Sequence, residues 1–234
     1  MYTINIAIIE DNAEDLKRLN DCLDRYMQNC KYSFTIHHFS SGESFLASGL
    51  SFHLVFMDIE LPGISGLETS ERLRKTSEDE VLVLVTNMIQ YAIHGYAVKA
   101  ADYIVKPVMY EQLSLKMPDY LSIIKRKQKS VLIRQNNSLS KIYIHQIRFI
   151  EVFRHDVYIQ LENEKLKCRG TLKEFEDELD GCGFVKCSQS CLVNLGFVQG
   201  FVGDQVMVDG HQLPMSRREK KSFSDAFIRF EKEW

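Results

Sequence analysis

The chain has 234 residues, of which 45% are hydrophobic and 26% are charged, and its net charge at pH 7 is −3. This size allows one large domain or two ordinary ones, and either arrangement can bury a proper core. No run of 18 apolar residues is present and the N-terminus meets an acidic pair instead of a basic leader, so we expect no membrane-spanning helix, no signal peptide and a cytoplasmic location.

The distribution of charge indicates the kind of partner, and the spacing of the cysteines indicates their redox state. Residues 1–120 carry 10 Lys+Arg and 17 Asp+Glu, a net of −7, whereas residues 121–234 carry 19 and 15, a net of +4. The basic half therefore indicates an anionic partner. The 6 cysteines show neither a CxxC motif nor a zinc-ligand pattern, so we expect reduced thiols.

The first 120 residues predict alternating strands and helices. Residues 13–27 place leucines on one helical face, as an amphipathic helix does. Continuous apolar runs separated by helices are typical of a parallel sheet covered on both faces, so we expect an α/β doubly wound fold with a five-stranded parallel sheet. The predicted strands occupy residues 4–9, 34–39, 54–57, 81–85 and 102–105.

From about residue 120 the pattern changes to closely spaced β-type runs. The basic stretch 120–130 indicates a helix end that runs into a linker, and Pro118 is expected to break or kink that helix. Helices are predicted behind a capping box of Thr171 and Glu174, and from Ser216 onward. The second half is therefore predicted to be mainly β with short helices. Its strands are expected at residues 131–134, 141–144, 147–153, 156–161, 184–187, 191–198 and 205–208.

Polar side chains follow the strands predicted in the first half. Taken alone, each fits a turn, a helix cap or a loop. Because the carboxyl ends of parallel strands meet at one edge of a sheet, we expect these side chains to lie together. They are Glu10 and Asp11 after the first strand, Asp58 at the end of the third, Thr86 at the end of the fourth, and Lys106–Pro107 after the fifth.

Such a combination of groups has a definite chemistry. Crowded carboxylates favour a hard cation, and Mg²⁺ prefers carboxylates together with water and phosphate oxygens. With a metal present, Asp58 can act as a nucleophile toward a phosphoryl group. Lys106 would neutralise charge on the phosphoryl oxygens, and Thr86 would hydrogen-bond one of them.

On these residues, together with Tyr103, residues 1–122 resemble the receiver domain of bacterial two-component response regulators. The resemblance implies that Asp58 is the phosphoacceptor for a partner histidine kinase. It implies that Asp11, Asp58 and the backbone carbonyl of Glu60 bind Mg²⁺, with Glu10 acting through water. It also implies a cis bond between Lys106 and Pro107.

The same resemblance implies a switch. A phosphate adds roughly −1.5 to −2 of charge at neutral pH. Thr86 is then expected to move toward the phosphate and Tyr103 to turn inward into the vacated space. The result is a population shift that promotes dimerisation.

Residues 133–234, behind a predicted linker at 123–132, resemble the LytTR DNA-binding domain. The resemblance rests on the segments 147–161, 184–194 and 213–221. A receiver followed directly by a LytTR domain is similar to the AgrA-type response regulators. The implied partner is double-stranded DNA carrying paired direct repeats.

Candidate DNA contacts lie in loops or at a helix start. His155 tops a turn between two strands, and the Gln189 amide can pair with adenine. Behind the Ser216 cap, Arg218 is expected to contact guanine and Arg217 the DNA backbone. Asn194 is interpreted as structural. Further phosphate contacts are expected from Arg154, Arg169, Lys186, Lys220 and Lys221, although the last two also fit a solvated helix face.

The sequence thus predicts a transcriptional response regulator that is not an enzyme. Two alternatives stay open. One is a module in which the receiver gates binding of a protein or an RNA. The other is a phosphohydrolase with Asp58 as the covalent acceptor and Glu60, two residues on, as its acid.

Overall fold

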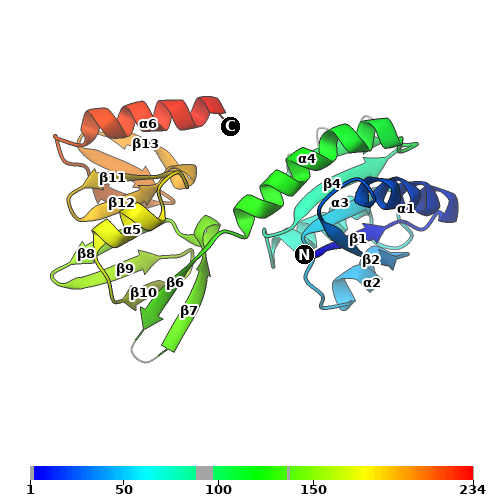
Figure 1. Ribbon diagram of the computed structural model, residues 1–234, viewed down its shortest axis with the longest axis horizontal. Helices are drawn as coiled ribbons and strands as arrows, with labels where there is room; N and C mark the ends of the chain where they lie inside the picture. The colour runs from blue at the N-terminus through cyan, green and yellow to red at the C-terminus, as the bar shows by residue number, and fades with distance from the viewer. Residues whose placement is uncertain (1–2, 88–96, 136–137, 234) are drawn as a thin grey trace. The chain divides into compact units, whose positions relative to one another are not determined.

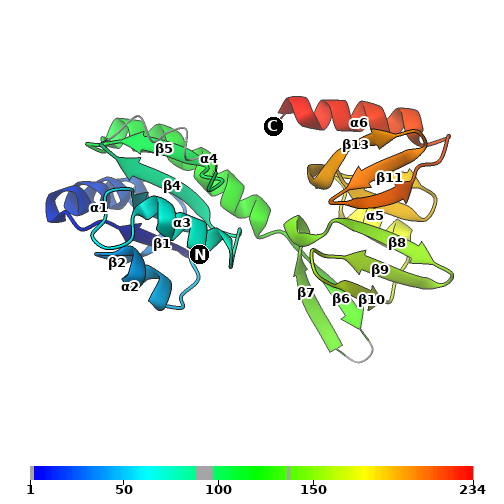
Figure 2. The ribbon, with the colours of Figure 1, turned by 180° about the vertical axis from the view of Figure 1, so that it is seen from behind.

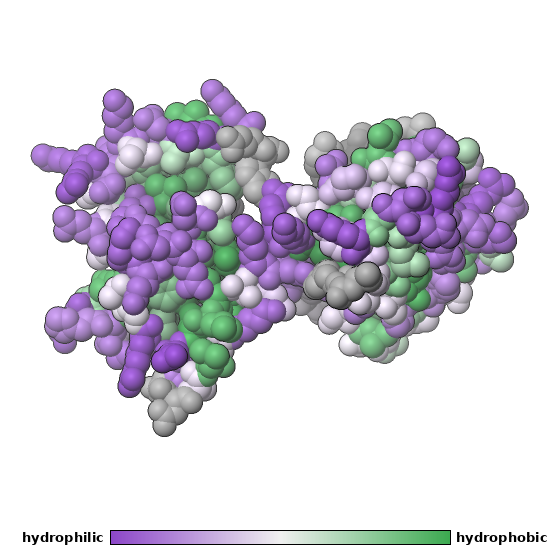
Figure 3. Space-filling view, viewed as in Figure 1, coloured by the Kyte–Doolittle hydropathy of each residue, from purple (hydrophilic) through white to green (hydrophobic). Residues whose placement is uncertain are grey.

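The computed structural model describes residues 3–87, 97–135 and 138–233. The chain divides into two compact units, Met1–Arg126 and Lys127–Trp234 (Figure 1). Each unit has its own hydrophobic core. Polar and charged residues cover most of the face seen in Figure 3, and apolar residues occupy smaller areas of it.

The first unit is built on a five-stranded sheet in the order β2-β1-β3-β4-β5, and every neighbouring pair is parallel. Strands β3 and β4 are buried along their whole length, which is why their sequences are continuously apolar. The predicted doubly wound sheet is confirmed. Its strands are β1 (Thr3–Ile9), β2 (Ser33–Phe39), β3 (Leu54–Asp58), β4 (Val81–Thr86) and β5 (Asp102–Val105).

Helices cover both faces of this sheet (Figures 1 and 2). On one face α1 (Ala13–Met27) and α4 (Tyr110–Lys127) bury a cluster that includes Leu23, Phe56 and Met117. On the other, α2 (Gly42–Ala47) and α3 (Gly66–Arg74) bury a cluster that includes Phe45, Met57 and Leu73. The amphipathic pattern of residues 13–27 predicts α1 with the bounds that the structure gives it.

The end of the first unit differs from the prediction. Helix α4 continues through Pro118 as far as Lys127. Proline removes one backbone hydrogen bond of the helix. Pro118 itself is exposed, however, and the residues around it, Met117, Tyr120 and Leu121, are buried against the sheet, so packing holds the helix together. Strand β6 begins at Ser130, so the predicted linker 123–132 is largely occupied by helix and strand.

The described residues of the second unit form three antiparallel β-structures. The largest has the order β10-β9-β8-β12-β11 and carries α5 (Leu172–Glu178) on one face. A hairpin and a three-stranded sheet complete the unit. The hairpin is β6 (Ser130–Gln135) and β7 (Ser138–Tyr143); the five-stranded sheet is β8 (Phe149–Phe153), β9 (Asp156–Gln160), β10 (Lys165–Cys168), β11 (Phe184–Ser188) and β12 (Cys191–Asn194); the three-stranded sheet is β13 (Val198–Val202), β14 (Gln205–Val208) and β15 (His211–Pro214).

Of the two helices predicted in the second unit, one begins where the sequence predicts and the other begins later. Thr171 and Glu174 form the predicted capping box at the start of α5. Helix α6 runs from Lys220 to Glu233, so it begins later than the predicted start at Ser216. The Ser216 hydroxyl still accepts a hydrogen bond from the Glu219 amide at 3.3 Å. Residues 217–219 therefore form a turn between the cap and the helix.

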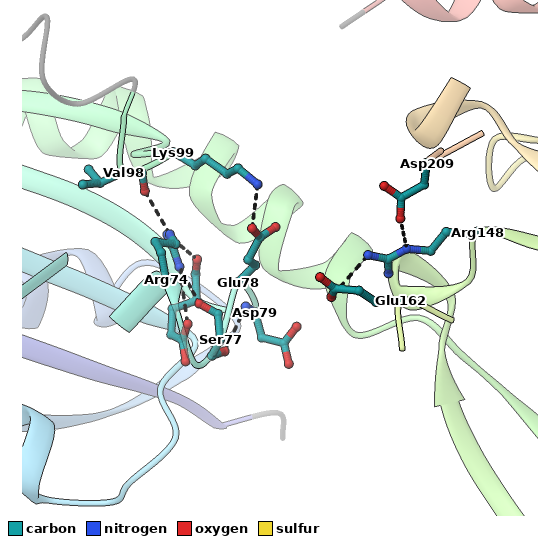
Figure 4. A network of polar contacts seen from close by, with 10 residues as sticks. Arg74, Ser77, Glu78, Asp79, Val98, Lys99, Arg148, Glu162 and Asp209 are labelled. Atoms are coloured by element: carbon teal, nitrogen blue, oxygen red, sulfur yellow. Dashed lines mark hydrogen bonds and ion pairs between the residues drawn. The ribbon is translucent and has the colours of Figure 1, made fainter. Parts of the chain in front are cut away.

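Each unit contains a largely buried arginine that ties separate segments together (Figure 4). In the first unit, Arg74 donates to the carbonyl oxygens of Val98 at 2.9 Å and Glu80 at 3.2 Å. In the second, Arg148 lies 2.9 Å from an Asp209 carboxylate oxygen and 3.3 Å from one of Glu162. Val98 and Asp209 are distant in sequence from the arginines that bind them, so these two contacts join separate segments of the chain.

Two predictions from composition can be compared with the described residues. All of the cysteines, Cys22, Cys30, Cys168, Cys182, Cys187 and Cys191, are free thiols. Among the helices of the described ranges, none is both long and apolar enough to cross a membrane.

Candidate functional site

The parallel strands of the first unit bring the predicted polar residues to one edge, which we call the carboxylate edge. Glu10 and Asp11 directly follow β1, and Asp58 is the last residue of β3. Thr86 ends β4, and its carbonyl oxygen accepts a hydrogen bond from the Lys106 amide at 2.9 Å. The Lys106–Pro107 peptide bond is cis, as predicted.

Lys106 is the centre of this edge. Its ammonium group lies 2.6 Å from a carboxylate oxygen of Asp58 and 2.6 Å from one of Glu10. All three side chains are almost completely buried, at about 4–5% exposure. The buried charges are thus paired, as groups withdrawn from water must be.

Local backbone geometry holds the two buried carboxylates in place. The second Asp58 oxygen accepts a hydrogen bond from the Glu60 amide at 3.1 Å, and Glu10 accepts one from the Asn12 amide at 3.1 Å. Gly66, at the start of α3, packs directly on the Asp58 backbone, where an added Cβ atom would lie 1.8 Å from the carbonyl oxygen. Only glycine allows this approach.

Burial changes the protonation of the site. It raises the pKa of Glu10 to about 7, and the hydrogen bond from Lys106 only partly offsets this effect. Burial alone would lower the pKa of Lys106, but its hydrogen bonds to Asp58 and Glu10 raise it above the ordinary value of 10.5. The ammonium therefore stays charged at neutral pH and provides a fixed positive charge beside Asp58.

The donor set at this edge fits a hard divalent cation. Carboxylate oxygens of Glu10, Asp11 and Asp58 all lie within 4.8 Å of one another. Asp11 is exposed and the other two are buried, so the cluster is open to solvent on one side. Oxygen ligands with room for water are the coordination that Mg²⁺ prefers.

Thr86 and Tyr103 lie next to each other on neighbouring strands. Thr86 is fully buried, and its side chain is hydrogen-bonded to the Tyr103 hydroxyl. Tyr103 is partly buried, and this burial raises the pKa of its phenol above 10.0. The two side chains are therefore already in contact.

One residue of this site was missed in the sequence. Asp15, in the first turn of α1, lies 3.1 Å from the Lys106 ammonium through its carboxylate. Asn12 caps that helix by accepting from the amides of Glu14 and Asp15. A signal was present, since Asp15 falls in the first turn of the helix predicted directly after Asp11.

In the second unit, strand register brings several turns to one edge of the five-stranded sheet, which we call the turn edge. Phe153 pairs with Asp156 across the β8–β9 turn, which contains Arg154 and His155. Cys191 of β12 pairs with Glu151 of β8, so the β11–β12 turn lies beside it. The two turns are linked by the Val152 amide, which donates to the Ser190 carbonyl at 2.8 Å.

Two further segments reach the turn edge. Cys168, the last residue of β10, pairs with Val157, so Arg169 emerges at this edge. The Ser216 amide donates to the Cys187 carbonyl at 2.8 Å, which places the turn before α6 beside the end of β11. The structure therefore brings together six exposed side chains from separate segments: Arg154, His155, Arg169, Gln189, Arg217 and Arg218.

Other predicted contacts are engaged elsewhere. Lys186 forms an ion pair of 2.5 Å with Glu176 of α5, so its charge is satisfied within the unit. Lys220 bonds Asp204 at 2.8 Å and the Gly203 carbonyl at 3.0 Å. Asn194 is structural, as interpreted from the sequence, because its amide donates to the Ile147 carbonyl at 2.8 Å and its oxygen accepts from Gly196.

The chain thus holds a doubly wound unit with a carboxylate edge, followed by a β-rich unit with a cationic turn edge. Residues 6–117 match the family model of the response regulator receiver domain. Residues 137–228 match the family model of the LytTr DNA-binding domain. The chain belongs to the transcriptional response regulators that join a receiver domain to a LytTR DNA-binding domain.

Known proteins of this kind are similar along much of the chain. The transcriptional regulatory protein NatR of Bacillus subtilis is 24% identical over 202 residues, covering 85% of each protein. The sensory transduction protein LytT of Oceanobacillus iheyensis is 26% identical over 156 residues, covering 63% of each. Among solved structures, a BeF3-activated DrrB receiver domain is 27% identical with a TM-score of 0.46, covering 52% of this chain and 99% of that one.

Proposed function

We propose that this protein accepts a phosphoryl group on Asp58 from a partner histidine kinase, and that phosphorylation promotes dimerisation and sequence-specific binding of double-stranded DNA. One observation carries the first part of this proposal. The Asp58 carboxylate ends a buried strand, bonded to a buried ammonium and clustered with two further carboxylates. A carboxylate held in this way is suited to attack a phosphorus atom and not merely to cap a turn.

The groups around Asp58 fit phosphoryl transfer. An Asp58 oxygen would form a bond to phosphorus while the bond from phosphorus to the histidine nitrogen breaks. Lys106, which is already 2.6 Å from Asp58, would stabilise the oxygens of the transferred group. Mg²⁺ would be held by Asp11, Asp58 and the Glu60 carbonyl, with Glu10 acting through water, and it supplies charge neutralisation when bound. The ion pairs of Lys106 with Glu10 and Asp58 hold these side chains in position before a phosphoryl group is bound.

We infer that the switch passes through Thr86 and Tyr103. Their hydrogen bond couples the buried hydroxyl beside Asp58 to a ring in the outer part of the unit. A phosphate on Asp58 would attract Thr86 and so change the partner of Tyr103, while Lys106 and Pro107 keep the loop after β5 in position. The outcome is a shift toward a state that dimerises.

We infer that the turn edge binds DNA. His155, Gln189 and Arg218 are placed to contact base edges, and Arg154, Arg169 and Arg217 to contact phosphates. Lys186, because it is paired with Glu176, is left as a weak candidate. A dimer would present two such edges to paired direct repeats. The protein would turn over no external substrate, and its cytoplasmic location stays a prediction.

Selection from a random duplex pool tests the proposal. The full-length protein is incubated with the pool in MgCl₂, with and without acetyl phosphate, and binding to the enriched duplex is measured by fluorescence anisotropy. We expect the phosphodonor to add one phosphoryl group to the protein, seen by mass spectrometry, and to tighten binding about 5- to 150-fold. The Asp58→Ala variant should show neither effect.

Asp21→Ala, which removes an exposed carboxylate from α1, serves as the matched control and should behave as wild type. If the phosphodonor tightens binding of Asp58→Ala as well, the acceptor is a different residue. If no duplex is enriched but an RNA or a protein binds, the turn edge serves that partner instead. Multiple turnover of a phosphomonoester would identify a hydrolase.

A further inference from the structure

Phe153 is an exposed aromatic side chain at the turn edge. Its exposure is 62%, whereas Phe201, another exposed phenylalanine, is 37% exposed and packs on the rings of Phe223 and Phe227. The Arg154 guanidinium lies 5.5 Å from the centroid of the Phe153 ring. Single exposed apolar side chains are common on protein surfaces, so exposure alone does not indicate a role for Phe153. Its position in the sheet is the more informative observation.

Strand alternation decides which way Phe153 faces. Ile150 and Val152 of β8 pack into the cluster under α5. Phe149, four residues before Phe153, belongs to the opposite cluster together with Cys187 and Phe223. Phe153 therefore lies on the sheet face that carries the start of α6. The strand order β8-β12-β11 places it about 10 Å, two strand spacings, from the end of β11, to which the turn that contains Arg217 and Arg218 is hydrogen-bonded.

The residue that follows Phe153 has an unusual backbone. Arg154 has a φ of 59°, a left-handed conformation that side chains with a Cβ rarely adopt and that favours glycine or asparagine. Arg154 is the first residue of the two-residue turn between β8 and β9, where a positive φ matches the twist of the strands, so the turn holds the arginine directly beside Phe153. The tip of β8 thus presents a cation and an apolar ring side by side.

We propose that Phe153 contacts the C5-methyl group of a thymine in the major groove. This inference rests on the proposed binding of DNA by the turn edge. Most groups on the major-groove floor are hydrogen-bond donors and acceptors, and the thymine methyl is the apolar one. A ring beside Arg154 and His155 matches that group, and the contact makes Phe153 a determinant of base preference.

The test removes the methyl group and the ring separately and then together. The probe is the duplex that the wild-type protein enriches from the random pool, in which each thymine is replaced in turn by deoxyuridine. At one thymine position per half-site, we expect the replacement to weaken wild-type binding about fourfold, the loss of one methyl contact. Phe153→Ala should bind the parent duplex about tenfold more weakly and show no further loss with deoxyuridine at that position.

Three controls separate this contact from other causes. Leu132→Ala removes an equally exposed side chain, at 60%, from the hairpin strand β6, and should keep the full deoxyuridine effect. The dependence of affinity on salt should be unchanged in Phe153→Ala but weaker in Arg154→Ala, because phosphate contacts set that dependence. Phe153→Leu, with part of the apolar area, should keep part of the effect. An unchanged melting temperature excludes misfolding.

The outcomes distinguish the two proposals. If a duplex is enriched but every deoxyuridine weakens wild type and Phe153→Ala equally, or none weakens wild type, the methyl contact is wrong and DNA binding stands. If no duplex is enriched, the DNA-binding proposal fails and the thymine contact fails with it.

Discussion

The Lys106 ammonium neutralises the repulsion between the neighbouring carboxylates of Glu10 and Asp58. Replacing it with Met would leave Glu10 and Asp58 buried without a counter-charge. We expect the free energy of unfolding at pH 7 to fall by about 3 kcal/mol in buffer without divalent ions, as happens when one partner of a buried ion pair is removed. The loss should shrink in MgCl₂, because a bound cation supplies the missing charge and stabilises the folded state. Urea denaturation with and without MgCl₂ measures both effects.

Lys17→Met is the matched control for this variant. Lys17 pairs with Asp21 on the exposed surface of α1, and such surface pairs contribute about 0–1 kcal/mol. The control should therefore unfold close to wild type and respond to MgCl₂ as wild type does. An equal loss in Lys106→Met at all MgCl₂ concentrations would show that the ammonium has a purely packing role.

At the scale of elements, His53 joins β1 to the start of β3. Its Nδ1 accepts a hydrogen bond from the Asn5 amide at 2.8 Å, and its own amide donates to the Asn5 carbonyl at 2.9 Å. Burial lowers the pKa of His53 below 6.5. As pH falls, the unfolded chain therefore binds this proton before the folded chain does, and stability is lost below about pH 6.5. We expect this part of the loss to disappear in His53→Asn, which keeps an acceptor but does not titrate.

Chemical unfolding of the two proteins between about pH 5 and 7.5 measures this difference. His38→Asn, at an exposed position on β2, should follow the wild-type curve. If wild type and His53→Asn lose stability in parallel as the pH falls, the ring is not held in its neutral form by the amide of Asn5.

The elements also show why one edge could be predicted from the sequence and the other only in part. All parallel strands end at one edge, so a residue that follows a strand is placed without further knowledge, as for Asp58 and Lys106. The turn edge depends instead on antiparallel register, and β10, β13 and β15 were not predicted. Lys186 shows the limit, because the sequence displays its charge but not Glu176, which reaches it from α5. Tertiary packing likewise overrides the break expected at Pro118.

At the scale of the whole molecule, each unit has its own core and a size at which single domains fold. A cut between Gln128 and Lys129 leaves α4 complete and keeps the Lys129 carbonyl, which accepts from the Ile144 amide at 2.9 Å. We expect the fragments 1–128 and 129–234 each to unfold cooperatively. MgCl₂ should raise the melting temperature of the first fragment alone, because the carboxylate cluster belongs to it.

The same fragments separate the switch from the contact surface. The second fragment holds every residue of the turn edge, so it should bind the selected duplex with no response to acetyl phosphate. Asp58→Ala in the first fragment should abolish its phosphorylation. Calorimetry and fluorescence anisotropy of the two fragments measure these outcomes. If either fragment unfolds without a cooperative transition, the units depend on each other for folding, and the phosphorylation signal then acts on stability as well as on association.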